Sequence, residues 1–286
     1  MRNFYRGLLL SASAAAIACA TAGGALAADP YALSDPSRMP AVSAVNAKLG
    51  LFGGSLSGNG AFGATGSVAM PLGGQFGGQI DGLVGSADGN TFYGVGGHLF
   101  WRDPSVGLLG GYASYVGWGD GVTTIGGVDD APLYDIAGAQ VAKVGIEGEA
   151  YMGHVSLEAA AAYQAGSNTG FAGRTALAYY ATDDLRLDIG YNYLQGPGGS
   201  FTAGAEWQVA NTGTTLFADA AYRSSDAWSA VGGIRMYFGG EQKSLIRRHR
   251  EDDPDNLLPG DLFTIVGDAY CPVDHTLLDG FCDSNS

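Results

Sequence analysis

The feature that most constrains this chain is a series of short alternating segments without any long apolar stretch. After the first 30 residues, no window of 18 consecutive strongly apolar residues occurs, so no helical membrane span is expected in the mature chain. Between residues 44 and 239, apolar and polar residues instead alternate in segments of about ten residues, the length that a tilted strand needs to cross a bilayer. If such a chain spans a membrane, it must form a closed β-barrel, because lipid cannot satisfy an open sheet edge.

The number and spacing of these segments support the barrel. Twelve segments are separated by Gly, Asp, Asn, Pro or Ser turns, and an even number returns the last strand to the side of the first. Connections after even-numbered segments are tight ("RDPS", "TDDL"), whereas those after odd-numbered segments include the long "GDGVTTIGGVDDAPLYD". Membrane barrels alternate short periplasmic turns with longer external loops in this way. The predicted strands are 44–52, 60–71, 75–85, 91–101, 106–118, 136–150, 154–164, 172–182, 185–195, 200–209, 214–223 and 228–238.

Alternation along each strand assigns one apolar and one polar face. In "LRLDIGYNYL", Leu187 and Ile189 share the first face, and Arg186 and Asp188 share the second. A soluble sandwich would show the same alternation, so the pattern alone does not distinguish the two folds. Aromatic residues near strand ends favour a membrane barrel, where they form interfacial girdles. These residues are Tyr191, Tyr193, Trp207, Tyr222, Trp118 and Trp101.

The N-terminal segment, residues 1–27, is predicted to be a secretory signal peptide. Arg2 and Arg6 precede an apolar stretch, and the small-x-small sequence "ALA" marks a cleavage site before Ala28. Cys19 would allow a lipoprotein, but the residues before it do not match a lipobox well, so it is expected to be lost with the leader. Loss of the two arginines takes the formal charge from −14 to −16, so no basic nucleic-acid footprint is present.

The last predicted strand resembles the C-terminal signal of Gram-negative outer-membrane β-barrel proteins. Ile234, Met236 and Phe238 share its apolar face, and the strand closes on the aromatic residue. The resemblance covers residues 44–239 and the signal peptide. It implies a porin-like barrel in outer-membrane lipid, recognised by the barrel-assembly machinery through this strand. Many members of the family end at the aromatic residue, whereas here 48 residues follow Phe238.

Of these, residues 240–286 are predicted to form a short periplasmic tail. The tail opens with "EQKSLIRRHREDDPDN", which is too polar for hydrocarbon and is expected to be a solvated linker, although "RRHR" leaves anionic headgroups or a periplasmic partner open. Cys271 and Cys282 are expected to form a disulfide, because an even pair in an exported chain favours one. A zinc site through His275 would have only three obvious ligands. Residues 28–43 are expected to be a periplasmic segment or a plug.

The inward face of the predicted barrel collects nearly all of its charge. Arg102 is the one Lys or Arg between residues 44 and 239 that is placed elsewhere, in a periplasmic turn. Two interpretations of this lumen wall stay open: a salt-bridge network that fills a narrow barrel, or a constricted aqueous channel. The predicted wall residues are Lys48, Asp81, Lys143, Glu147, Glu149, Glu158, Arg174, Arg186, Asp188, Glu206, Asp219, Arg223 and Arg235.

The sequence favours transport over catalysis. His98, expected to face inward with Phe92 and Phe100, and His154, expected in a turn, have no obvious Ser partner, so no enzyme, cofactor or metal is predicted. We expect a small porin-like channel for ions or small solutes, and the acidic external loops predict cation preference. The alternatives are a non-conducting barrel that anchors its tail or presents loops, and a lipid-modifying enzyme if a Ser or Asp lies beside His98.

Overall fold

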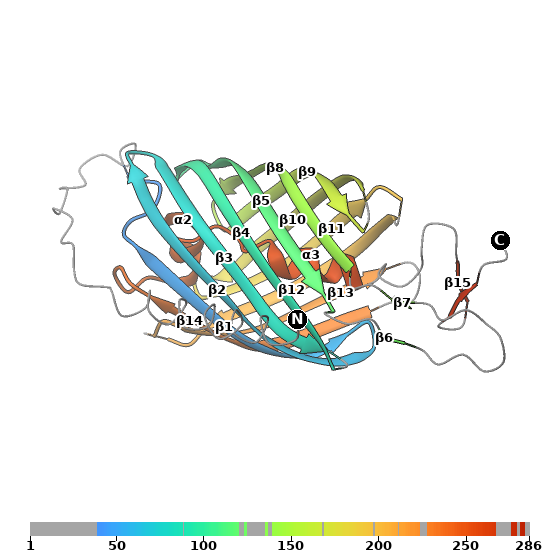
Figure 1. Cartoon of the computed structure of the whole chain (residues 1–286). Coiled ribbons are helices and arrows are strands. Elements are labelled where there is room, and N and C mark those ends of the chain that lie inside the picture. Colours follow the sequence, from blue (N-terminus) through green and yellow to red (C-terminus); the bar gives the residue numbers. More distant parts are fainter. Residues whose placement is uncertain are drawn as a thin grey trace, which may run out of the picture. The chain divides into compact units, whose positions relative to one another are not determined.

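The computed structural model is a closed antiparallel barrel of twelve strands (Figure 1). Strands adjacent in sequence are adjacent in the barrel, and β14 pairs with β1 to close it. This confirms the predicted fold class, with two short helices added after the last strand. The structure describes residues 39–87, 89–119, 123–124, 135–136, 139–167, 169–196, 198–210, 212–223, 228–266, 276–278 and 281–283.

The twelve barrel strands agree with the predicted segments to within a few residues. They are β1 (Asn46–Leu56), β2 (Asn59–Gly73), β3 (Phe76–Ala87), β4 (Asn90–Asp103), β5 (Gly107–Trp118), β8 (Ala139–Met152), β9 (Val155–Gly166), β10 (Gly170–Thr182), β11 (Leu185–Leu194), β12 (Gly198–Gln208), β13 (Thr214–Arg223) and β14 (Trp228–Phe238). Two-residue strands β6 (Thr123–Thr124) and β7 (Asp135–Ile136) pair with each other, as do β15 (Thr276–Leu278) and β16 (Phe281–Asp283).

The outer surface of the barrel is apolar, as a lipid-facing surface must be. Along β11, Leu187, Ile189 and Tyr191 are exposed, while Arg186, the residue before Leu187, is buried on the inside. The same alternation runs through β8, where exposed Val144 and Ile146 flank inward-facing residues. Exposed large apolar side chains on neighbouring strands would be costly in water, but they suit a bilayer.

Two residues lie elsewhere than the sequence predicts. Trp118 is not part of an interfacial girdle: it is buried inside the barrel and stacks on Phe92, with ring centroids 5.7 Å apart. Arg102 is not in a turn: it belongs to β4, is fully buried, and donates to the carbonyl oxygen of Ala41 at 3.1 Å. For Arg102 the reason is that β4 continues beyond its predicted end at residue 101. For Trp118 the reason is that the alternation along β5 places the side chain inward. Strand ends are the least reliable part of such a prediction.

The closing contact between β1 and β14 depends on a glycine. A Cβ atom at Gly233 would lie 1.9 Å from the carbonyl oxygen of Leu51, on the opposite strand of the seam. No side chain can occupy that position without moving backbone. At Gly53, on the same seam, the nearest atom to an added Cβ is 3.7 Å away, an ordinary contact distance.

We expect Gly233→Ala to impair barrel closure, because the added methyl group separates the two strands of the seam. The fraction of protein that keeps the heat-modifiable gel mobility of a closed barrel should fall strongly. Gly53→Ala is the matched control and should migrate like the unmodified protein. A fully closed Gly233→Ala barrel would contradict the account of the seam.

Two helices follow the barrel in the chain, α2 (Leu245–Glu251) and α3 (Leu258–Val266). Figure 1 shows both within the ring of strands. Among the helices in the described part of the chain, none is long and apolar enough to cross a membrane.

Candidate functional site: the lumen and the segment that fills it

Residues 243–263, here called the lumen segment, fold back into the barrel. The chain reverses direction after Phe238 at Gly239 and Gly240, whose φ angles of 86° and 64° favour glycine. At the start of α2, the amide of Ile246 donates to the carbonyl oxygen of Asp183 at 3.0 Å, in the short turn between β10 and β11. The segment therefore enters the barrel at the end that carries the short turns.

This course corrects the prediction of a solvated linker. Several charged side chains of the lumen segment are buried, among them Arg248, Asp252, Asp253 and Asp261. The sequence argument correctly excludes them from hydrocarbon, but the inside of a barrel is a second polar environment. Charged residues are stable there because they pair with the wall, which a linear sequence does not show.

Three carboxylates of the lumen segment each bind a basic residue of the wall. Asp253 accepts from Lys48 Nζ at 2.6 Å. Asp261 accepts from Lys143 Nζ at 2.6 Å and from the Ser114 hydroxyl at 2.7 Å.

Asp255 completes the set by binding the Arg174 guanidinium at 2.5 Å. The three wall cations come from β1, β8 and β10, so the segment is held from different sides of the barrel.

Helix α2 is fixed at the short-turn end by further polar contacts. Arg248 Nε donates to Gln208 Oε1 at 3.1 Å, and Arg250 donates to the carbonyl oxygen of Val155 at 2.9 Å. Lys243 binds Asp252 at 2.8 Å, and Asp252 also pairs with Ser43. The part of residues 28–43 that the structure describes thus contacts the lumen segment.

His249 on α2 is enclosed by the wall. Its Nδ1 lies 2.9 Å from the Tyr180 hydroxyl, and its Nε2 lies 3.2 Å from the Tyr237 hydroxyl. Nε2 also lies 3.9 Å from Glu206 Oε2. A neutral imidazole fits these contacts, because one ring nitrogen can donate to a hydroxyl oxygen while the other accepts from a hydroxyl group.

Helix α3 lies at the opposite end of the barrel, near the long loops. Leu258 and Leu262 pack in an apolar cluster with Phe92, Val116 and Trp118. These wall residues lie where β4 begins and β5 ends, away from the short turns. The lumen segment thus crosses the barrel from one end to the other, whereas the sequence predicts that everything after Phe238 stays at the end where β1 begins.

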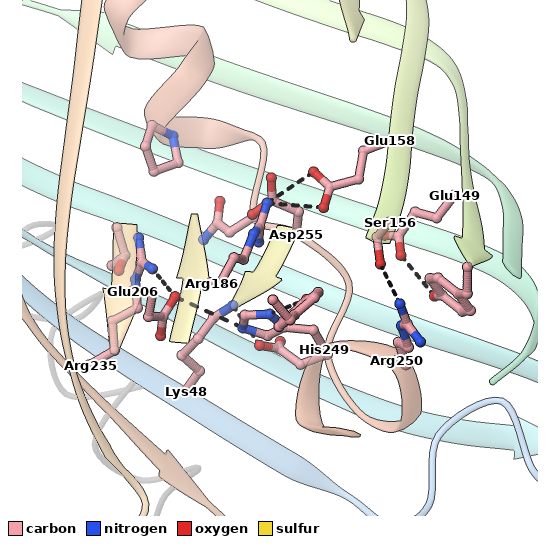
Figure 2. Close-up of a pocket in the computed structure, with 16 residues that line it drawn as sticks. Lys48, Glu149, Ser156, Glu158, Arg186, Glu206, Arg235, His249, Arg250 and Asp255 are labelled. Carbon is pink, nitrogen blue, oxygen red and sulfur yellow. Dashed lines mark hydrogen bonds and ion pairs between the residues drawn. The ribbon is translucent and has the colours of Figure 1, made fainter. Parts of the chain in front are cut away.

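The thirteen predicted wall residues all lie at inward positions, buried or half-buried. Several form networks within the wall (Figure 2). Arg186 binds Glu158 at 2.9 Å and Asp188 at 3.3 Å.

The remaining carboxylates of the wall also have partners in the wall. Arg235 pairs with Glu206, and it lies 3.2 Å from Asp219. Glu149 accepts from the Tyr151 hydroxyl at 2.7 Å. Arg223 is buried at the end of β13.

His98 does have an Asp beside it, the feature that would have favoured an enzyme. Its Nε2 lies 2.9 Å from Asp81, and its Nδ1 lies 2.8 Å from Glu147. The Nδ1–Glu147 contact has hydrogen-bond geometry, whereas the contact of Nε2 with Asp81 Oδ2 is an ion-pair distance without that geometry. Tyr112 stacks on the ring at 5.9 Å. Both ring nitrogens of His98 therefore face carboxylates of the wall.

Little free space is left in the lumen. A cavity of about 40 Å³ lies between wall and segment and is lined by residues that include Lys48, Glu149, Arg186 and His249 (Figure 2). A second, of about 80 Å³, lies beside Asp219 and Phe263. Such volumes hold a few water molecules, and the polar lining suits them.

Sequence reasoning missed the uncharged wall residues that bind the lumen segment. Gln79 donates to the carbonyl oxygen of Pro254 at 3.2 Å, and Gln208 donates to that of Lys243 at 2.8 Å. The alternation along β3 and β12 places both glutamines on the inward face, which was the available signal. Their partners could not be identified, because the sequence does not show that residues 243–263 enter the lumen. The predicted Cys271–Cys282 disulfide and the His275 zinc ligand lie outside the side chains that the structure describes.

Comparison with known proteins supports the fold. No protein-family model and no curated protein matches this sequence. Among solved structures, a KdgM porin in complex with disordered oligogalacturonate is similar, with a TM-score of 0.50 and 10% identity over 67% of this chain and 99% of that chain. The Salmonella typhi outer membrane phospholipase dimer has a TM-score of 0.46 and 13% identity over 73% of this chain and 93% of that chain. The likeness to the KdgM porin shows a shared β-barrel fold at low sequence identity.

Proposed function

We propose that this outer-membrane β-barrel is a channel for small solutes that is closed by its own lumen segment. The observation that carries the proposal is how the segment is held. Its middle, residues 253–261, binds the wall through side-chain ion pairs and hydrogen bonds, not by adding a strand to the sheet. Polar contacts of this kind exchange readily for contacts with water, so the segment can leave without opening the barrel.

The wall itself supports the proposal, because it does not need the segment to stay closed. Twelve strands form an unbroken ring of backbone pairing, and the carboxylates of the wall have partners within the wall. Displacing the segment would therefore leave an intact barrel whose polar lumen fills with water.

A permanently filled, non-conducting barrel is the second candidate. The observation that favours it is the small size of the cavities between wall and segment, since volumes of about 40 and 80 Å³ hold only a few water molecules. The two candidates differ in one measurable respect, which is whether the segment can be displaced from the lumen.

A reversible lock between segment and wall tests the channel directly. Ser114→Cys and Asp261→Cys replace a hydrogen-bonded pair, in a background with Cys271→Ser and Cys282→Ser. In planar bilayers, we expect the unlinked protein to show discrete openings and the same protein joined by a short reducible thiol cross-linker to be silent. Cleavage of the linker should restore the openings.

The control is Ser114→Cys alone in the same background, treated with the same reagent. It should conduct equally before and after treatment, because no second thiol is present. A folded unlinked barrel that stays silent at all voltages would contradict the channel and favour the non-conducting barrel.

A further inference from the structure

The charge pairing inside the lumen is asymmetric between acidic and basic wall residues. Every carboxylate predicted to line the wall has a partner within the wall: Asp81 and Glu147 on His98, Glu158 and Asp188 on Arg186, Glu206 and Asp219 on Arg235. Glu149 binds the Tyr151 hydroxyl. Each acidic wall group therefore keeps a partner within the wall whether or not the lumen segment is present, with two carboxylates on each of His98, Arg186 and Arg235.

Three basic wall residues behave differently. Among the described residues, the ion pairs of Lys48, Arg174 and Lys143 are made with Asp253, Asp255 and Asp261 of the lumen segment. When the segment leaves, these three cations lose their carboxylate partners, while the acidic wall groups keep theirs. An emptied lumen therefore presents three cations without a carboxylate partner at these positions.

We propose that the open lumen binds and passes anionic solutes, carboxylates in particular, at Lys48, Arg174 and Lys143. The proposal rests on the proposed function, because it describes the lumen after the segment is displaced. The segment supplies the argument for the ligand class, since its own carboxylates occupy the three sites in the closed state. It closes the channel as a tethered competitor of the solute.

The positions of the three cations support a series of anion-binding positions along the lumen instead of a single binding site. Asp253, Asp255 and Asp261 follow one another along a segment that crosses the barrel from the α2 end to the α3 end. Their three partners are therefore met in order along the lumen. Each of the three is at least half-buried, so low-dielectric surroundings strengthen its attraction for an anion.

This inference opposes the cation preference predicted from the acidic loops. Asp88, Asp120, Asp129, Asp130 and Asp226, on which that prediction depends, lie outside the described residues. Loop charges in open solvent are screened within about 8 Å at physiological salt, whereas charges inside a narrow lumen are screened less. We expect the lumen charges to decide the selectivity.

The test uses the full-length chain with Asp253→Asn, Asp255→Asn and Asp261→Asn, which weakens the segment's hold but leaves the wall unchanged. In a KCl gradient, the reversal potential of this variant should have the sign of chloride preference, and citrate should block the current reversibly. Spermidine at the same concentration, a cationic probe, should not block.

Adding Lys48→Gln, Arg174→Gln and Lys143→Gln should abolish chloride preference and citrate block while openings persist. Adding Lys243→Gln instead is the control, because Lys243 is a cation that pairs within the lumen segment. Openings that are cation-selective and insensitive to citrate would overturn the anion inference and leave the channel standing. A folded barrel of the Asn variant without any openings would overturn the proposed function itself.

Discussion

Replacing Asp253, Asp255 and Asp261 together with Asn is expected to open the lumen of the full-length protein. Each carboxylate binds one wall cation, and a hydrogen bond to a charged group contributes about 1.5–3 kcal/mol. Even at the lower value, losing all three shifts the equilibrium between docked and displaced segment by about a thousandfold. The opening frequency in planar bilayers measures this shift.

The control for this variant changes the same number of charges away from the lumen. Asp103→Asn, Asp183→Asn and Glu241→Gln alter side chains at the short-turn end that form no ion pair with the lumen segment in the described structure. The control should open as rarely as the unmodified protein. Equal opening of both variants would show that net charge, and not the three wall contacts, holds the segment.

Acidification from pH 7.5 to 5 is expected to favour release of the segment through protonation of His249. The docked ring lies 2.9 Å from the Tyr180 hydroxyl and 3.2 Å from the Tyr237 hydroxyl, an arrangement that a neutral imidazole satisfies by donating from one nitrogen and accepting at the other. The displaced ring is in water, where histidine titrates at about pH 6.5, so docking is strongest above that pH and weakens below it. The opening frequency should therefore rise between pH 7.5 and 5.

His249→Gln keeps a hydrogen-bonding side chain and should flatten the response between pH 7.5 and 5. An unchanged response in that variant would assign the effect to another group.

Local regularities explain why the barrel was predictable from sequence. Strand alternation repeats in twelve strands, and turn residues and loop lengths follow one pattern along the eleven connections, so an error in one segment is corrected by the others. Inward residues such as Lys48 and Glu206 followed from position alone, because a lipid-facing charge is too costly. The fold and the faces of the wall are therefore encoded by patterns within about ten residues.

The partners of the wall could not be predicted in this way. Lys48 and Asp253 are 205 residues apart, and no local pattern connects them. The segment "REDDPDN" has the composition of a solvated linker, and composition alone cannot tell bulk water from a polar lumen. The segment lies in the lumen because its charges complement those of the wall, and the lumen exists only after the barrel has closed.

The lumen segment takes the chain from one end of the barrel to the other once more, in addition to the twelve strands. Twelve strands return the chain to the end where it began, and residues 243–263 then carry it across a thirteenth time without touching lipid. Residues 252–257 of this crossing are neither helix nor strand, which hydrocarbon would not tolerate but a protein-lined interior does. Asn46 and Val266 consequently lie toward opposite faces of the bilayer, so reporters placed beside them would be exposed to two different compartments.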